Sequence, residues 1–462
     1  MTNGRLTFDH TITFLFFTVL FAAACLVPLQ SDTWWHLRAG QEMWSRHFVM
    51  LADEFSFTAN GQYWPNHEWL GDVLLFAGYR AGGLPGVTLL AASCLTTATA
   101  LSWKLMPASA RLNLLLMVVA IPSLVFVWTV RPLVFSMLLL MIVLQLGLKA
   151  IYWPMPFVFA LWANLHGGVA LGLVVLGALA VADAYLHGLS TAWKWGVRLA
   201  SAFVGTLLTP LGVRLWTTIP NSIHKSVANG IQEWRPAMLA WRDAPFWILA
   251  VALVILTATR FRKPMTKDRA AVTFVALALL PLAIRYSRNI TPFVLVALPA
   301  ISHNLWAIGW DLPRQPDRRQ HYQANLGLVS IAAIACVLIV AFAWSKPLPR
   351  LQWRPVSPAV IAAVESCPGP VYNRFDDGGY LIWFAPRVPV FVDNRQDPFP
   401  LEFLQEHLHS EGSGQFEPVF QRYRITCAFL PHVSPTAHRL REAGWPVDVE
   451  DARWVVFHRP RN

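Results

Sequence analysis

Long apolar runs separated by short polar segments fill the first three quarters of the chain. Each run approaches the roughly 20 residues that an α-helix needs to cross the hydrocarbon layer of a membrane. The pattern predicts membrane-spanning helices at 11–29, 84–103, 111–129, 132–149, 167–187, 196–216, 245–259, 271–285, 290–309 and 325–344. An eleventh segment, 154–164, is short and flanked by Pro154 and Pro156, and the predicted topology depends on its being a crossing.

Beyond residue 344 the apolar runs give way to shorter alternating stretches. GPVYN, VPVFVD, ITCAFLP, VDVE and RWVVFH predict strands, and LEFLQEHL and TAHRLREAG predict amphipathic helices. We therefore predict a mainly α polytopic membrane domain at 1–344, with an outer loop at 30–83, followed by a small soluble α/β domain at 345–462. The stretch 68–81 is predicted to be a helix that lies on the membrane, because Asp72 and Arg80 interrupt it.

Composition supports this division. Only 14% of the 462 residues are charged and 55% are hydrophobic, whereas about 25% are charged in a typical soluble domain. These values exclude a nucleic-acid-binding module and a disulfide-stapled miniprotein. The net charge of +11 does not indicate a particular ligand, because Lys and Arg also accumulate in the cytoplasmic loops of membrane proteins.

The distribution of cations gives an orientation. With a cytoplasmic N-terminus and eleven crossings, every inner turn is basic, as the positive-inside rule requires. The residues concerned are Arg5, Lys104, Arg111, Lys149, Lys194, Arg198, Arg260, Arg262, Lys263, Lys267, Arg269, Arg314, Arg318 and Arg319. This orientation predicts an extracytoplasmic tail, where Cys367 and Cys427 could pair.

The outer loop contains an unusual mixture of acids and aromatic rings. Acids and histidines alternate there with tryptophans: Asp32, Trp34, Trp35, His36, Asp53, Glu54, Trp64, His67, Glu68, Trp69 and Asp72. Aromatic rings can stack on the apolar face of a sugar, and a carboxylate can accept a hydroxyl proton. The alternative is an amphipathic loop in which Trp anchors the interface and the acids face solvent.

A second polar set lies at other helix ends that the topology places on the same side. It comprises Arg131, His166, Glu233, Arg285 and Arg288. Arginines at the outer boundary run against the positive-inside tendency, and a guanidinium group matches the geometry of phosphate oxygens. Each residue alone could be a snorkelling cation, a satisfied core histidine or a helix cap. Together with the loop acids they predict a site for an anionic, lipid-linked sugar.

Several of these segments resemble a group of poorly characterised bacterial polytopic proteins that is similar to the GT-C superfamily of glycosyltransferases. The segments are DTWWHLRAG, DEFSFTANGQYWPNHEWL, RPLVFS, WANLHGG, EWRP and VYNRFDDGGYLIWFAPRVPVFVDNR. The resemblance implies a multi-helix membrane domain, an acidic first outer loop and transfer of a sugar from a polyprenyl-phosphate donor. It implies that Asp32 acts as catalytic base or orients the acceptor, with Asp53 or Glu54 at the second acidic position.

The remaining assignments complete the predicted site. His36, His67, Glu68, Trp34, Trp35, Arg131, His166, Glu233, Arg285 and Arg288 are predicted to bind substrate, with the arginines on the donor phosphate. No cofactor is required, but loop acids such as Asp32, Asp53 and Glu68 could hold Mg²⁺ or Mn²⁺. The expected partners are a lipid-linked sugar donor and membrane lipids, without nucleic acid, and the sequence leaves the oligomeric state open.

The predicted reaction is an inverting single displacement on the extracytoplasmic side of a bacterial inner membrane. Two alternatives remain, a transporter or flippase for lipid-linked glycans and a noncatalytic assembly partner. The sequence has no inverted repeat with paired broken helices, which many transporters contain.

Overall fold

The protein is described by a computed structural model that covers residues 7–259, 263–312, 322–346 and 349–460. Within these ranges the chain forms two compact units. Unit 1 comprises 1–27, 85–212 and 232–346, and unit 2 comprises 28–84, 213–231 and 347–462. Six cations used in the orientation argument lie outside the described residues: Arg5, Arg260, Arg262, Arg314, Arg318 and Arg319.

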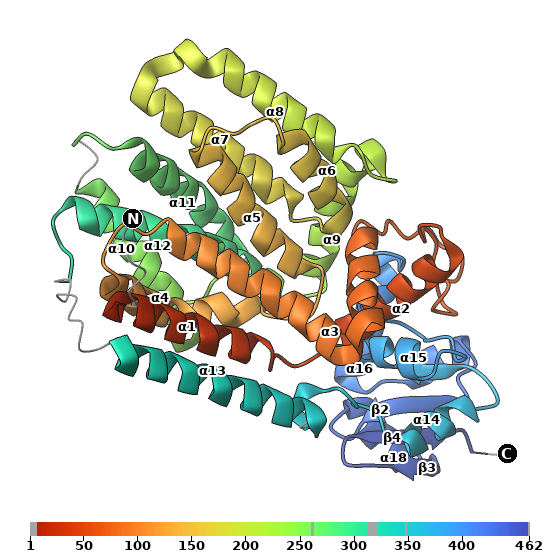
Figure 1. Ribbon diagram of the computed structural model, residues 1–462. Helices are drawn as coiled ribbons and strands as arrows, with labels where there is room; N and C mark the ends of the chain where they lie inside the picture. The colour runs from red at the N-terminus through yellow and green to blue at the C-terminus, as the bar shows by residue number, and fades with distance from the viewer. Residues whose placement is uncertain (1–6, 260–262, 313–321, 347–348, 461–462) are drawn as a thin grey trace. The chain divides into compact units, whose positions relative to one another are not determined.

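Unit 1 consists of helices that follow the apolar runs of the sequence (Figure 1). They are α1 (Phe8–Ala24), the second part of α3 (Trp69–Lys104), α4 (Ala110–Leu124), α5 (Leu133–Leu148), α6 (Met155–Leu165), α7 (Val169–His187), α8 (Ala192–Thr206), α10 (Ala244–Ala258), α11 (Lys267–Arg285), α12 (Ile290–Ala307) and α13 (Tyr322–Ser345). Each predicted span overlaps one of them, but α8 ends at Thr206, well before the end of the span predicted at 196–216. The predicted fold class, mainly α with a small α/β part, is confirmed.

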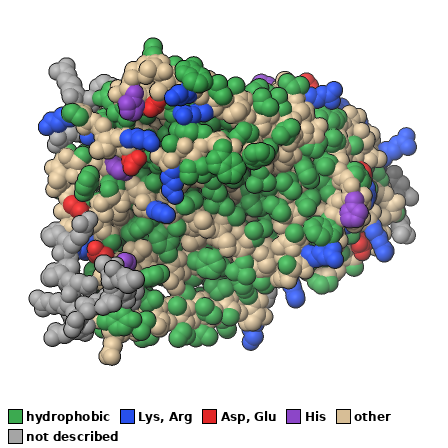
Figure 2. All heavy atoms as spheres, turned by 45° about the horizontal axis from the view of Figure 1, so that its top comes forward, with side chains coloured by type: hydrophobic (Ala, Val, Ile, Leu, Met, Phe, Trp, Pro, Cys, Tyr) green, Lys and Arg blue, Asp and Glu red, His purple; other side chains and the backbone are tan. Residues whose placement is uncertain are grey.

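Several of these helices can cross a membrane. In the described part of the chain, five helical segments are long and apolar enough to do so: Trp69–Lys104, Val169–Thr206, Trp241–Ala258, Ser287–Ala307 and Tyr322–Ser345. The apolar helices α1, α4, α5 and α6 are shorter. Figure 2 shows hydrophobic side chains over much of the visible face, as expected for a surface that contacts lipid. The chain is a multi-pass membrane protein.

Helix α12 forms the centre of unit 1. Nearly all of its side chains are buried, and its polar groups bond to neighbouring helices. Ser302 donates to Asn113 at 2.9 Å, and Arg269 donates to Asn304 at 2.9 and 3.1 Å. Such interhelical bonds satisfy polar groups that water cannot reach. By contrast, α13 packs against α1 and leaves most of its apolar side chains exposed.

The short helix α6 returns the chain along α5. Before α6, the hydroxyl of Tyr152 donates to the carbonyl of Gly147, in the last turn of α5. After α6, His166 Nδ1 lies 2.8 Å from Ser136 Oγ, in the first turn of α5. The two helices therefore run antiparallel, and the 154–164 segment carries the chain from one end of the bundle to the other.

Unit 2 joins the predicted outer loop to the tail. Its elements are α2 (Ser31–Arg46), the first part of α3, α9 (Leu215–Ala228), β1 (Val371–Asn373), β2 (Cys427–Pro431), β3 (Val447–Glu450), β4 (Trp454–His458) and the tail helices α14 (Pro358–Glu365), α15 (Gly378–Phe384), α16 (Leu401–Ser413), α17 (Glu417–Arg422) and α18 (Pro435–Glu442). The sheet order is β1-β2-β4-β3, with β1 and β2 parallel and the other pairs antiparallel. Helix α3 is interrupted at Gly82 and Gly83, where the backbone is not helical.

The core of unit 2 lies between the sheet and the tail helices. Tyr372, Phe391, Phe420 and Phe457 are buried there, and Ala59 of the outer-loop segment belongs to the same cluster. A disulfide joins Cys367 to Cys427, as the sequence allowed. It closes a separation of 60 residues, which restricts the unfolded tail.

Two local predictions need correction. The segment 388–393 is not a strand of the sheet. Val390 instead exchanges backbone hydrogen bonds with Phe55 and Phe57, and the side chain of Asn373 bonds to the backbone nearby, so the sheet is not needed to satisfy these groups. The predicted outer loop is also more ordered than its polar composition indicated, because α2 begins at Ser31, directly after the first predicted span.

Gly378 and Gly379 lie at a strand-to-helix junction in the tail. A short turn links β1 to α15, which begins at Gly378. A Cβ on Gly379 would lie 2.2 Å from the carbonyl oxygen of Ser31, and one on Gly378 would lie 2.2 Å from that of Val392. Gly379 therefore allows α15 to approach the start of α2 closely, and Gly378 allows it to approach the 392–393 segment.

Candidate functional site

Asp32 lies in the first turn of α2, in contact with the tail. Its carboxylate accepts a hydrogen bond from the side-chain amide of Asn394. Burial raises the pKa of Asp376, and the charges of Glu411 and Asp32 raise it further, whereas Arg374 lowers it. Because these carboxyl groups influence one another, the first turn of α2 and the NRFDD motif form one acidic region of unit 2.

One turn further along α2, His36 begins a row of alternating acids and histidines. His36 Nδ1 lies 2.6 Å from Asp72, and its Nε2 lies 3.7 Å from Glu68. His67 then approaches Glu68 at 3.8 Å and Asp397 at 3.9 Å. Since residues four apart share one face of a helix, His36 lies on the same side of α2 as Asp32.

The tail end of this row is held by α9. Ser222 donates to Asp397 at 2.7 Å, and Lys225 donates to the backbone carbonyls of Asp397 and Phe399 at 2.9 and 2.8 Å. Burial raises the pKa of Asp397, although His67, Ser222 and Lys225 oppose the rise. The segment after β1 and the outer loop are thus tied together by polar contacts inside unit 2.

Trp34 and Trp35 are interior residues, with 1% and 7% of their surface exposed. Trp34 packs against Trp383 and Phe384 of α15, with ring centroids 5.9 and 4.7 Å apart. Trp35 lies over the His36 ring at 3.5 Å. Their rings pack against protein, and a stacking role on sugar stays a prediction.

Asp53 and Glu54 differ sharply in environment. Asp53 is fully buried and accepts hydrogen bonds from Arg395 at 2.5 Å, from the Ser56 hydroxyl and from two backbone N–H groups. Arg395 also bonds to Asp393 at 2.6 Å. Burial alone would lower the pKa of Arg395, but the two carboxylates raise it. Glu54 is 40% exposed and pairs with Arg46.

The contacts of Asp53 argue against its role in the predicted Mg²⁺ or Mn²⁺ site. Both carboxylate oxygens of Asp53 accept hydrogen bonds inside the protein, so Asp53 does not fit as a ligand shared with Asp32 and Glu68. Across the described ranges, no group of three or more His, Cys, Asp or Glu side chains is arranged to hold a metal ion. Binding of Mg²⁺ or Mn²⁺ by other residues stays a prediction.

In unit 1, four residues of the second polar set meet. Glu233 accepts from Arg288 at 2.6 Å and from Arg131 at 3.1 Å, so one carboxylate holds two guanidinium groups. Arg288 also lies 3.0 Å from Nε2 of His166. Arg131 precedes α5, His166 follows α6, and Arg288 lies between α11 and α12. Residues far apart in sequence therefore converge at one end of the bundle.

The two arginines keep Glu233 charged. Burial acts to raise the pKa of Glu233, but Arg288 and Arg131 outweigh it and lower the pKa to about 2. Glu233 is therefore ionised at neutral pH. Arg285 is not part of this contact network, because its guanidinium lies over the ring of Tyr286 at 4.8 Å.

The surrounding helices fix the position of His166. Trp162 donates to Ser136 Oγ at 2.7 Å, and Ser136 in turn contacts His166 Nδ1. A Cβ on Gly168 would lie 2.5 Å from Ser136 Oγ and 2.9 Å from the His166 ring, so the sequence HGG lets the chain turn tightly here. His166 therefore presents Nε2 to Arg288 in a fixed orientation.

Three tail residues that hold the site together were missing from the predicted set. Asn394 and Arg395 bond to the loop acids Asp32 and Asp53, and Asp397 bonds to Ser222 of α9. The signal for them was the polar run DNRQD directly after the apolar VPVFV. Whether the acids of unit 2 and the arginines of unit 1 form one pocket stays a prediction.

Solved structures with a similar fold include an archaeal oligosaccharyltransferase and ArnT. The chain is similar to the Archaeoglobus fulgidus oligosaccharyltransferase tethered with an acceptor peptide, at 13% identity and a TM-score of 0.56, over 92% of this chain and 69% of that one. It is also similar to AglB from Archaeoglobus fulgidus in complex with an inhibitory peptide and a dolichol-phosphate, at 12% and 0.58, over 91% and 69%. ArnT from Cupriavidus metallidurans matches at 14% and 0.55, over 97% of this chain and 99% of that one.

Sequence identities this low show a similarity of fold and nothing more. The predicted resemblance to the GT-C superfamily is confirmed for the fold. No family model and no curated protein sequence matches the chain.

Proposed function

We propose that this protein is a membrane glycosyltransferase that moves a sugar from a polyprenyl-phosphate donor to an acceptor on the extracytoplasmic side. The observation that carries the proposal is the pair Arg131 and Arg288, which the ionised Glu233 holds together. Arginine pairs suit a phosphate because their N–H groups match its oxygens. The likeness in fold to an oligosaccharyltransferase and to ArnT supports the same reaction class.

A neighbouring segment supports a lipid-linked donor. Leu239 and Trp241 follow Glu233 closely in the chain, and 91% and 89% of their surfaces are exposed. The segment is held in place, because Asp243 accepts from the backbone N–H of Met238 at 2.9 Å. Large apolar side chains that stand this far out of the protein favour contact with lipid rather than with a soluble nucleotide sugar.

The proposed mechanism is one inverting displacement. The acceptor hydroxyl loses its proton to Asp32 while its oxygen forms the new bond to the anomeric carbon. The bond between that carbon and the donor phosphate breaks, and its electron pair leaves with the polyprenyl phosphate. Arg131 and Arg288 would stabilise the charge that grows on this leaving group.

The contacts within unit 2 suggest how Asp32 is supported. Asn394 donates to its carboxylate and fixes its orientation. His36, on the same face of α2, is tied to Asp72 at 2.6 Å and can hold a proton near Asp32. Asp53 is better explained as a structural residue, because its carboxylate is enclosed by Arg395 and Ser56.

The disulfide and the charge pattern support the proposed orientation. Disulfides persist in oxidising compartments, and Cys367 pairs with Cys427 in the tail. The basic turns fit a cytoplasmic location for the opposite helix ends. A bacterial inner membrane with the tail outside satisfies both conditions.

The test uses purified full-length protein in detergent. Polyprenyl phosphate is first added without sugar, and binding is measured by native mass spectrometry. A radiolabelled polyprenyl-phosphate sugar is then supplied with a lipid and glycan extract of the cell envelope as the acceptor source. The proposal expects retained polyprenyl phosphate in the first step and release of the label from the lipid in the second.

The outcomes separate the alternatives. A flippase would bind the donor and leave its sugar–phosphate bond intact. An assembly partner would neither bind polyprenyl phosphate nor release the label. Either result would overturn the proposed transferase activity.

A further inference from the structure

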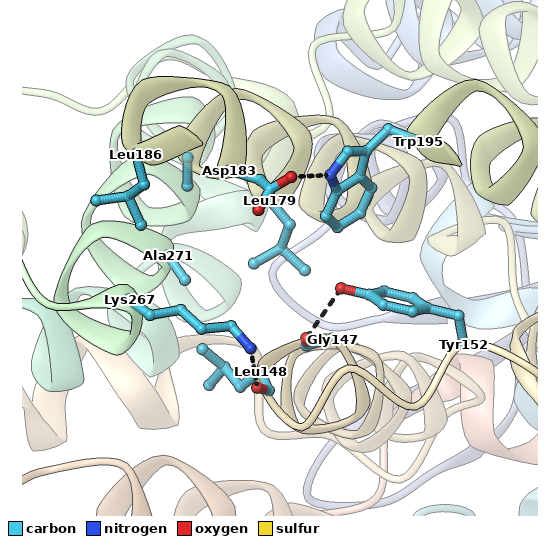
Figure 3. Close-up of a pocket in the computed structure, with 10 residues that line it drawn as sticks. Gly147, Leu148, Tyr152, Leu179, Asp183, Leu186, Trp195, Lys267 and Ala271 are labelled. Carbon is cyan, nitrogen blue, oxygen red and sulfur yellow. Dashed lines mark hydrogen bonds between the residues drawn. The ribbon is translucent and has the colours of Figure 1, made fainter. Parts of the chain in front are cut away.

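The end of unit 1 opposite the arginine pair contains a second polar region. Arg131 precedes α5 and Lys149 follows it, whereas Lys267 begins α11 and Arg285 ends it. At the Lys149 and Lys267 end lies a small cavity, lined in part by Leu148, Tyr152, Asp183, Leu186, Trp195 and Lys267 (Figure 3). This region plays no part in the proposed sugar transfer.

One cation, Lys267, lines this cavity, and a second, Arg198, stacks on two of its lining rings. Lys267 extends along the cavity wall and donates to the carbonyl of Leu148 at 3.2 Å, as Figure 3 shows. The guanidinium of Arg198 lies 3.7 Å from the Tyr152 ring centroid and 4.6 Å from that of Trp195. Stacking of this kind holds a guanidinium by its face and leaves its N–H edge able to bond.

The cations outnumber the acids here. Asp183 is the carboxylate of the cavity wall, and it accepts from Thr191, from Trp195 and from His187. Within the described ranges, neither Arg198 nor Lys267 forms an ion pair with a carboxylate. The segments 147–152, 183–198 and 263–269 around the cavity contain six cations, Lys149, Lys194, Arg198, Lys263, Lys267 and Arg269, against Asp183 and Asp268, which leaves four positive charges in excess.

An apolar surface continues from this basic end. Helices α6 and α8 pack against each other, and both expose large apolar side chains. Phe157 on α6 is 69% exposed, and Val197 on α8 is 60% exposed. At the cavity end, Trp153 and Trp193 are 77% and 68% exposed, as is typical of tryptophan at the membrane–water interface.

We propose that this end of unit 1 binds the headgroup of an anionic glycerophospholipid. Arg198 and Lys267 contact the phosphate, with the Tyr152 hydroxyl and Lys149 nearby. The acyl chains lie along the exposed surface of α6 and α8. The charge excess selects an anionic lipid over a zwitterionic one, and the apolar surface selects a lipid over a free phosphate.

The test compares lipids in nanodiscs that contain the full-length protein. The discs hold phosphatidylcholine alone or equal parts of phosphatidylcholine and phosphatidylglycerol. Co-purified lipid is counted by mass spectrometry after transfer to detergent, and thermal stability is measured in both discs. We expect phosphatidylglycerol to be retained selectively and to raise the melting temperature.

The variants isolate the two cations. The double variant Arg198→Gln with Lys267→Gln should weaken phosphatidylglycerol retention by about tenfold or more. Each cation near an anionic lipid strengthens binding by somewhat less than about tenfold, and the variant removes two of them. The matched control is Lys104→Gln with Lys346→Gln, which removes two exposed cations elsewhere in unit 1 and should retain the lipid. If the double variant folds poorly in phosphatidylcholine, Arg198→Lys serves in its place and should reduce retention partially.

Three results would overturn the proposal. The first is equal retention of phosphatidylglycerol and phosphatidylcholine by the unaltered protein. The second is equal loss of phosphatidylglycerol in the test and control variants, which would indicate general attraction to negative charge. The third is equal stabilisation by inorganic phosphate alone, which would make free phosphate the ligand.

Discussion

Arg288 and Glu233 form an ion pair of 2.6 Å that joins the turn between α11 and α12 to the segment that precedes α10. Glu233 binds Arg131 with its other carboxylate oxygen, at 3.1 Å. One acid thus aligns two guanidinium groups that precede α5 and follow α11. Arg288 also reaches His166, so it links Glu233 to the residue that follows α6.

Replacing Arg288 by Lys should therefore impair donor binding. The ammonium group keeps the charge but cannot contact Glu233 and His166 in the same fork-like way. We expect polyprenyl-phosphate affinity to fall by about tenfold, the equivalent of roughly 1.4 kcal/mol, measured by native mass spectrometry. Arg285→Lys is the matched control, since Arg285 stacks on Tyr286 outside the cluster. An equal loss in both variants would remove the special role of Arg288.

Asp32→Asn should separate chemistry from binding. The amide keeps the shape of the side chain but is a very poor base, and general-base catalysis typically contributes 10²- to 10⁴-fold. We expect donor turnover to fall by about 100-fold or more, with polyprenyl-phosphate binding unchanged. Glu54→Gln is the comparison, because Glu54 is exposed and pairs with Arg46, and its turnover should stay near that of the unaltered protein. Full turnover in Asp32→Asn would rule out Asp32 as the base.

Arg395→Met should destabilise unit 2 strongly. Removal of this cation leaves Asp53 and Asp393 buried without their partner, which typically costs about 3–5 kcal/mol. The readout is the melting temperature of the full-length protein in detergent. Arg422→Met is the control, because its pair with Glu406 is exposed and its loss should leave the melting temperature nearly unchanged. Similar melting temperatures in the two variants would contradict a structural role for the Asp53–Arg395–Asp393 group.

The stability of unit 2 should depend on the protonation of Asp377. Burial raises its pKa to about 7, Arg374 opposes the rise, and Asp376 and Glu411 add to it. The folded protein therefore holds this proton more tightly than the unfolded chain does. The stability that the proton provides is complete below the ordinary carboxyl range and is lost as the pH rises through about 7.

Asp377→Asn should remove this dependence. The melting temperature of the unaltered protein should decline relative to the variant as the pH rises from acidic values to above 7. The control is Glu442→Gln, an exposed carboxylate of α18. Parallel curves for the unaltered protein and Asp377→Asn would show that Asp377 does not titrate in this range.

The helices of unit 1 could be predicted because each apolar run is long and bounded by polar or proline residues. Even the short helix α6 was recoverable from hydropathy. The helix α2 was not, since its apolar side chains alternate with Asp32, His36 and Arg38 and read as a polar loop. The prediction of a strand at 388–393 was wrong. The pattern of apolar residues in this segment does not reveal that Asn373 and the 55–57 segment bond to its backbone.

For the candidate site, residue type and position at helix ends indicated Arg131, His166, Glu233 and Arg288. The predicted topology already placed these four residues at the same end of the bundle. Their contacts could not be predicted, because they depend on how α5, α6 and α11 pack. Asp53 shows the limit of such reasoning. Its sequence position matches a catalytic acid, yet its role depends on Arg395, 342 residues away in the chain.

The proposed transfer reaction is tested most directly by a cryo-electron microscopy structure of the full-length protein with polyprenyl phosphate. We predict phosphate density in hydrogen-bond contact with Arg131 and Arg288, with the carboxylate of Asp32 facing the bound phosphate. Phosphate bound elsewhere, or an Asp32 carboxylate directed away from a phosphate that does contact the arginines, would contradict it.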